Sequence, residues 1–235
     1  MTLTQDLNSV IQEYIDDFMR KQSIPYVVKP SIPIVWFGDM VKYNNSSKKI
    51  VTVGLNPSFG EFTVSRFEIV NLKSSNAIAD LSKTLNCYFK KNPYSWFNPF
   101  EKVLHFLDAS YYENRATNTA IHIDIYSAIA TNPTWGGLSE NEKEDIRRTD
   151  LFKKILNILD PDIIVFSANQ KVFEEIFYNF MFEKSVEDIG NKKGFFIRKY
   201  KNADKFLISG RNMRGQPFGG ISDREMQEAM QQLLS

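Results

Sequence analysis

Residues 49–58 read KIVTVGLNPS, and this stretch decides the fold. Its first seven residues form an apolar, β-branched run between a polar turn and a loop that contains a proline. Such a run is typical of a strand buried on both faces, as in a parallel sheet covered by helices. We therefore predict the first core strand here, with residues 56–58 just beyond its carboxyl end.

Outward from this strand, helical patterns alternate with further apolar runs. Apolar residues recur at helical spacing in five segments, 7–18, 78–85, 100–107, 151–159 and 223–234. Further apolar runs span residues 120–130 and 162–167, and residues 194–200 and 205–209 predict a hairpin. Strands that alternate with helices indicate an α/β fold with an open, mostly parallel sheet covered on both faces.

The chain reads as one domain over residues 1–235, because no repeat, low-complexity tract or linker divides it. Its content of 43% apolar and 14% aromatic residues is enough to fill a sizeable core. We expect the core at about residues 48–222, preceded by an N-terminal helical extension over residues 1–47.

Charge and cysteine content narrow the classes of function. The chain has 29 Lys and Arg against 28 Asp and Glu, so any surface for nucleic acid must be a local patch. The single cysteine, Cys87, excludes an internal disulfide framework and a cysteine-built zinc site, and we expect a buried thiol. Acidic residues interrupt the apolar positions of residues 1–17, which argues against a signal peptide or membrane span. We expect a soluble, cytoplasmic monomer that needs no metal or cofactor.

The first candidates for chemistry are the residues that follow each core strand, since ligands of open α/β sheets bind beyond the carboxyl ends of the strands. Four segments satisfy this condition: 54–62, 124–135, 167–170 and 209–222.

The first of these segments carries a resemblance. Gly54-Leu55-Asn56-Pro57-Ser58 resembles the first motif of the uracil-DNA glycosylase superfamily, a core strand that ends in Gly-x-Asn/Asp-Pro. The branch with Asn, which includes the mismatch-specific uracil glycosylases, is the most similar. The resemblance implies a three-layer sandwich around a mostly parallel four-stranded sheet. It also implies that Asn56 orients the attacking water beneath the sugar C1′, and that Phe59 or Phe62 stacks on the flipped base beside Ser58. Taken alone, Asn-Pro-Ser also fits a plain strand-to-helix turn.

The second segment extends the resemblance. The superfamily has an apolar strand that ends in a base-reading Asn, and residues 121–126 are similar except that Asp124 replaces the Asn. An ionised carboxylate only accepts hydrogen bonds, so it suits the amino group of a cytosine-type base better than a uracil carbonyl. The alternative is that Asp124 pairs with a nearby arginine or caps a turn.

The last segment, residues 206–217, stands where the superfamily has a strand and a His-Pro-Ser-like or Asn-Pro-Ser-like loop. Neither triplet is present here. By position, Asn212 would face the base, while Met213 and Arg214 would fill the gap left by flipping or bind phosphate. Arg211, Arg214 and Lys42 form the expected DNA-binding cluster. A glycine-rich surface loop with solvated arginines is the alternative.

Glu61 lies five residues beyond Asn56. A partly buried carboxylate at this place would act as a general base, whereas an exposed one would have no role. We therefore predict Asn56 and Glu61 as the catalytic pair, without a metal site.

The resemblance covers roughly residues 48–222 as an ordered series of elements. It implies a monofunctional DNA glycosylase that flips a base out of double-stranded DNA and hydrolyses its N-glycosidic bond, leaving an abasic site. Asp124 and the missing triplet favour a modified cytosine, in the sharpest version glucosylated hydroxymethylcytosine in phage DNA, as an antiviral defence. The alternatives are a uracil or mismatch repair glycosylase and a non-catalytic DNA-binding module of the same fold. A nucleotide-processing α/β enzyme is less favoured, because the sequence contains neither a Gly-x-Gly-x-x-Gly fingerprint nor a Gly-Lys-Ser loop.

Overall fold

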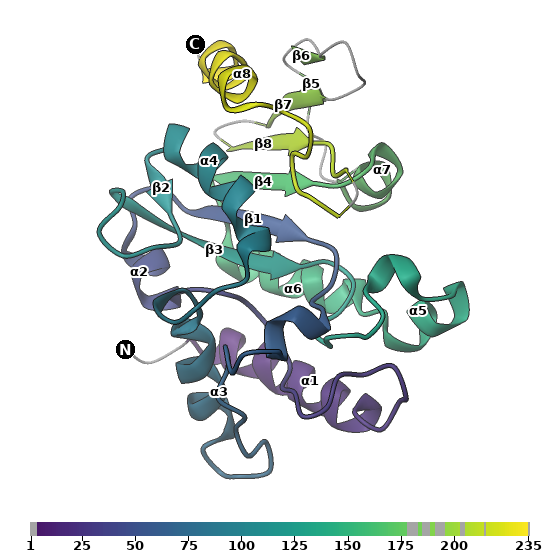
Figure 1. Ribbon diagram of the computed structural model, residues 1–235. Helices are drawn as coiled ribbons and strands as arrows, with labels where there is room; N and C mark the ends of the chain where they lie inside the picture. The colour runs from purple at the N-terminus through teal and green to yellow at the C-terminus, as the bar shows by residue number, and fades with distance from the viewer. Residues whose placement is uncertain are drawn as a thin grey trace. The chain divides into compact units, whose positions relative to one another are not determined.

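The computed structural model describes residues 4–177, 183–184, 189–190, 196–202, 205–213 and 215–234. It is an α/β structure with a mixed, mostly parallel sheet (Figure 1). The chain divides into two compact units. Unit 1 comprises Met1–Val41, Gly54–Tyr94 and Ile121–Asp160, and unit 2 comprises Lys42–Val53, Ser95–Ala120 and Pro161–Ser235. The single-domain organisation expected over residues 1–235 stays a prediction.

The central strands confirm the α/β pattern read from the sequence. Strand β1 (Ile50–Gly54) runs parallel to β4 (Ile163–Ser167), and every residue of both strands is buried. This is the doubly buried strand that the β-branched run predicts. On its other side β4 runs parallel to β8 (Lys205–Gly210). The predicted hairpin is confirmed, because β8 pairs antiparallel with β7 (Phe196–Asn202).

The described sheet extends beyond four strands. Its order is β2-β3-β1-β4-β8-β7-β5, with β6 also paired to β7. The additional short strands are β2 (Ala109–Ser110), which runs parallel to β3 (Asn118–Asp124), and β5 (Glu183–Lys184) and β6 (Ile189–Gly190), which run antiparallel to β7. Two-residue strands carry no periodic pattern, which is why the sequence did not predict them.

In unit 1, the predicted opening helix is α1 (Gln5–Lys21), which begins at the N-cap Thr4 and packs on α6 (Thr149–Leu159) and α3 (Ala77–Asn86). Asp17 of α1 is buried and accepts hydrogen bonds from Arg20, Lys21 and Arg148. Unit 1 also contains α5 (Glu140–Ile146) and the short 3₁₀ helices η1 (Phe59–Phe62), η2 (Tyr88–Lys90) and η4 (Trp135–Gly137).

In unit 2, α4 (Asn98–Phe106) and α8 (Asp223–Leu234) pack on one another, and the bounds of α8 match the prediction. The other helices are η3 (Ser95–Phe97) and α7 (Gln170–Phe177). The sequence did not predict the helix α2 (Met40–Asn45), because prolines and an Asn/Ser cluster suggested irregular structure in residues 23–47. Among the described residues, no helix combines the length and the apolar content that crossing a bilayer requires.

Candidate functional site

The loop after β1 and the loop after β3 lie side by side in unit 1. Strand β3 ends at Asp124, so the apolar run 120–130 is only partly a strand. The next two residues bond to the other loop, since Ile125 N donates to Gly54 O at 3.1 Å and Tyr126 N to Leu55 O at 2.9 Å. Further along, Thr131 N donates to Pro57 O at 3.3 Å. These backbone bonds place Asn56 against residues 129–131.

The side-chain amide of Asn56 is held in one orientation. Its Nδ2 donates to Pro57 O at 2.8 Å and to Ile129 O at 3.1 Å, with Thr131 Oγ1 at 3.4 Å. Because backbone carbonyls only accept hydrogen bonds, these two partners require the nitrogen, and the oxygen must point the other way. That oxygen, Oδ1, is buried and accepts no hydrogen bond from any described residue. A buried acceptor without a partner costs about 1–3 kcal/mol, so Asn56 presents a fixed and unused acceptor.

In the turn that follows Asn56, some side chains are buried and others face solvent. Ser58 caps η1, its Oγ accepting a hydrogen bond from Gly60 N at 3.3 Å. Within η1, Glu61 is buried and Phe59 is exposed, with 43% of its surface accessible. Ser58 therefore has the cap role that the sequence allowed as an alternative, and the turn directs Glu61 into unit 1.

Glu61 is a buried carboxyl group without an ion-pair partner among the described residues. Its Oε2 accepts a short hydrogen bond from the hydroxyl of Tyr88, and the Tyr88 oxygen accepts one from Tyr94 N at 3.1 Å. Burial raises the pKa of Glu61 to about 8; Asp124 also raises this pKa, whereas the Tyr88 hydrogen bond and Arg66 lower it. At neutral pH the group is therefore protonated, which favours the role of a proton donor over that of the predicted base.

Asp124 lies close enough to Glu61 and to Tyr14 to raise the pKa of both. It shares one face of β3 with His122, two residues earlier, and His122 Nε2 is 3.6 Å from Asp124 Oδ1. Both side chains are buried. Among the described residues, the basic side chain within ion-pair distance of Asp124 is thus a histidine, which is charged only when protonated, rather than the arginine considered from the sequence.

Arg66 fastens the loop that carries Glu61. Its guanidinium donates to Asn92 O at 2.8 Å, to Thr63 Oγ1 at 3.1 Å and, by a short bond, to Gly60 O. Its Cζ also lies 5.3 Å from the centre of the Tyr94 ring. The buried Arg66 thus connects η1 to the segment that follows η2 and adds a positive charge near Glu61.

The two predicted stacking residues differ in their surroundings. Phe59 is exposed, whereas Phe62 is half-buried and lies 5.6 Å from Phe67. Phe67 in turn stacks on Tyr88, with ring centres 4.9 Å apart and planes 28° apart. Phe62 therefore belongs to an aromatic group that packs against the partner of Glu61.

The other predicted site residues belong to unit 2. Lys42 pairs with Glu113, Arg211 is exposed, and Asn212 is half-buried. Met213 exchanges two backbone hydrogen bonds with Gln216, at 3.0 and 2.9 Å, and so forms a tight turn after β8. Arg214 lies outside the described residues.

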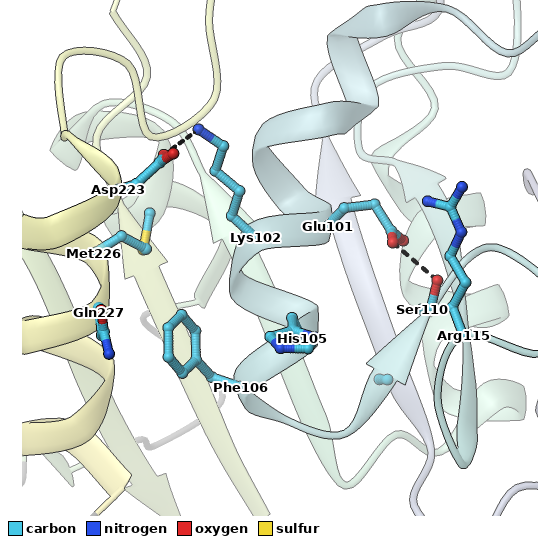
Figure 2. Close-up of a pocket in the computed structure, with 10 residues that line it drawn as sticks. Glu101, Lys102, His105, Phe106, Ser110, Arg115, Asp223, Met226 and Gln227 are labelled. Atoms are coloured by element: carbon cyan, nitrogen blue, oxygen red, sulfur yellow. Dashed lines mark hydrogen bonds and ion pairs between the residues drawn. The ribbon is translucent and has the colours of Figure 1, made fainter.

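Unit 2 also contains a groove of about 610 Å³ between α4, α8 and β2 (Figure 2). Phe106 and Met226 line it, with the Lys102–Asp223 ion pair at one end. At the other end, Glu101 accepts hydrogen bonds from Ser110 Oγ at 2.8 Å and Tyr111 N at 2.7 Å. Arg115 and His105 also line the groove. Its two carboxylates and two permanent cations balance, so electrostatics favour neither an anionic nor a cationic ligand.

The sequence missed several members of the unit 1 cluster: Tyr14, Arg66, Tyr88 and Thr131. None belongs to a motif, and each comes from a segment whose pattern indicates only packing or a loop. His122 lies in the segment 121–126, two residues before Asp124. We refer below to Asn56, Glu61, Tyr88, His122 and Asp124 as the buried cluster; Asn56 itself is half-buried, with its Oδ1 buried.

Within the described ranges, no three His, Cys, Asp or Glu residues lie together in a way that could hold a metal ion. Cys87 is half-buried, not buried as expected, and forms no disulfide. No protein-family model matches this chain, and a search of curated proteins finds no match either.

Proposed function

We propose that the protein hydrolyses the N-glycosidic bond of a nucleotide flipped out of DNA, with Asn56 holding the attacking water. The observation that carries this proposal is the Asn56 amide, whose nitrogen is fixed by two loops and whose buried oxygen has no partner among the described residues. Such an acceptor is suited to orient a water molecule, because a bound water would donate the hydrogen bond that the folded protein leaves unmade.

The reaction requires positive charge to develop on the sugar as the base leaves. Asn56 would hold the water on one face of the sugar, and the phosphates of the DNA would stabilise the charge. The base would lie toward Glu61 and Asp124, whose buried carboxyl groups offer a donor and an acceptor. The resemblance of residues 54–58 to the glycosylase motif supports the same assignment.

For the base, we propose an amino-bearing pyrimidine. An ionised Asp124 would accept from an exocyclic amino group, and it offers no donor to a uracil carbonyl. The most specific form of the proposal is glucosylated hydroxymethylcytosine in phage DNA. Uracil, as in mismatch repair, is the alternative base.

The test is excision from duplexes that contain uracil, hydroxymethylcytosine or glucosylated hydroxymethylcytosine, followed by alkaline cleavage at abasic sites. Asn56→Ala should abolish cleavage while DNA binding persists. Asn71→Ala is the matched control, since Asn71 is exposed and its side-chain oxygen accepts a local bond from Lys73 N. This control should cleave at the wild-type rate.

Cleavage by the wild-type protein would identify the base. DNA binding without cleavage of any duplex would instead support the non-catalytic module and remove the catalytic role of Asn56. Normal activity of the Asn56→Ala variant would remove that role alone.

A further inference from the structure

The role proposed for Asn56 does not explain why the carboxyl group of Glu61 is buried. The carboxyl group is 4% exposed and lies near a second buried carboxyl group, that of Asp124. Arg66 is the nearby cation, but its guanidinium donates hydrogen bonds to Gly60, Thr63 and Asn92. Burying two carboxyl groups close together favours keeping a proton on one of them.

The hydrogen bonds around Tyr88 indicate which oxygen of Glu61 carries that proton. The Tyr88 oxygen accepts from Tyr94 N, and its own proton is donated to Glu61 Oε2. Oε2 is therefore an acceptor, and Oε1 is the oxygen that remains to hold the carboxyl proton.

We propose that Glu61 donates this proton to the leaving base, an inference that rests on the proposed function. As the bond between C1′ and the base nitrogen breaks, its electron pair goes to the base, and the Oε1 proton goes to a ring nitrogen or carbonyl oxygen of that base. The water held by Asn56 forms the new C1′–O bond and releases a proton to solvent. Solvent then returns a proton to the Glu61 carboxylate.

This step defines a class of substrate. Uracil leaves as an anion stabilised by two carbonyl groups, whereas a cytosine-type base is a poorer leaving group and gains more from protonation. A proton donor at Glu61 therefore suits amino-bearing pyrimidines. Tyr88 is a positioning residue in this scheme, because it acts through Glu61.

The charges that face Glu61 give the expected pH dependence. Tyr88 of η2, Asp124 of β3 and Arg66 after η1 surround the carboxyl group, and burial raises its pKa to about 8. An acid in this state is protonated below about pH 8 and ionised above it. The rate of base release should therefore fall as the pH rises through that value.

The experiment measures single-turnover excision against pH on duplexes containing glucosylated hydroxymethylcytosine or uracil. Glu61→Gln keeps the shape and the acceptor for Tyr88 but has no acidic proton. We expect a loss of about 100-fold or more on the modified cytosine, a smaller loss on uracil, and no fall in rate near pH 8. Glu68→Gln is the control, because Glu68 is exposed and paired with Lys91.

Tyr88→Phe separates this role from a merely structural one. The Tyr88 hydrogen bond lowers the pKa of Glu61, so its loss should move the fall in rate to higher pH. Tyr26→Phe, which removes a tyrosine hydroxyl bonded to Glu142 O and Asp145, should leave the pH profile unchanged.

The two proposals fail in different ways. Excision by wild type with an unchanged rate and pH profile in Glu61→Gln would overturn the proton-donor role and leave the proposed function standing. No excision from any duplex by the wild-type protein would remove both. Thermal unfolding of each variant checks that the fold is retained.

Discussion

The buried cluster of unit 1 and the groove of unit 2 differ in whether their polar groups have hydrogen-bond or ion-pair partners. The groove offers about 610 Å³, yet Glu101 and Lys102 both have partners within it (Figure 2). In the buried cluster, Asn56 Oδ1 is buried without a partner among the described residues, and Glu61 keeps a proton at neutral pH. Burial raises the pKa of Glu101 in the groove as well as that of Glu61, so an unmet buried hydrogen-bond acceptor, more than volume or a shifted pKa, marks the candidate site for chemistry.

The sharpest test of this comparison is Asn56→Asp. A carboxylate would place an acceptor against Pro57 O and Ile129 O, where the amide now donates. We expect excision to fall about 1000-fold and the free energy of unfolding to fall by about 2 kcal/mol. Excision rates and urea unfolding check both.

Asn56→Ala completes that test, because it removes the unpaired oxygen together with the donor. Its free energy of unfolding should stay within about 1 kcal/mol of wild type although excision is lost. Equal destabilisation by Ala and Asp would contradict a fixed amide.

The next largest effect is expected on stability. Arg66→Ala removes three hydrogen bonds from a buried guanidinium, so the free energy of unfolding should fall by about 3 kcal/mol. Arg115→Ala, in the groove, removes an exposed guanidinium over the Tyr112 ring and should cost less than about 1 kcal/mol. Similar losses of unfolding free energy for Arg66→Ala and Arg115→Ala in chemical denaturation would contradict the stabilising role of the Arg66 hydrogen bonds.

Glu61 should also make stability depend on pH. Its pKa is raised from 4.5 to about 8 by folding, so the folded state holds a proton that the unfolded state releases between these values. The contribution is complete below pH 4.5 and declines by at most about 1.4 kcal/mol per pH unit up to pH 8. Glu61→Gln should therefore gain stability relative to wild type as the pH rises from 5 to 8. Parallel curves of melting temperature against pH for the two proteins would contradict this.

The smallest effect is expected in the groove. His105 is exposed on α4, so His105→Ala should change the free energy of unfolding by less than about 0.5 kcal/mol and excision by less than twofold. A tenfold loss of excision in this variant would break the comparison, because it would show that the groove takes part in the reaction.

Local patterns predicted the elements whose signal lies in consecutive residues. The run 49–55 is β1, residues 162–167 contain β4, and α8 spans the predicted range. The apolar run 120–130 misled, because Ile125 and the residues after it are buried by contacts between loops rather than by a strand. Periodicity reports burial and does not distinguish these two causes.

The candidate site was predictable only in part. Asn56 and Glu61 follow β1, and Asp124 is the last residue of β3, so the sequence could point to them. Tyr88 bonds to Glu61 across 27 residues of chain, and Arg66 acts through backbone oxygens that no side-chain pattern reveals. The raised pKa of Glu61, which favours a proton donor over the expected base, depends on burial, and burial exists only in the folded chain.

The contacts that fix the Asn56 amide have a consequence for how the protein is made. One of them, from Asn56 to Ile129, joins residues 73 apart in the chain, and Thr131 also pairs with Val27 from the N-terminal segment. Contacts of such separation must wait for chain closure, so they form late in folding. During synthesis, the acceptor of Asn56 cannot be fixed until residue 131 has left the ribosome. An incomplete chain therefore contains the motif but not the arrangement that would make it reactive.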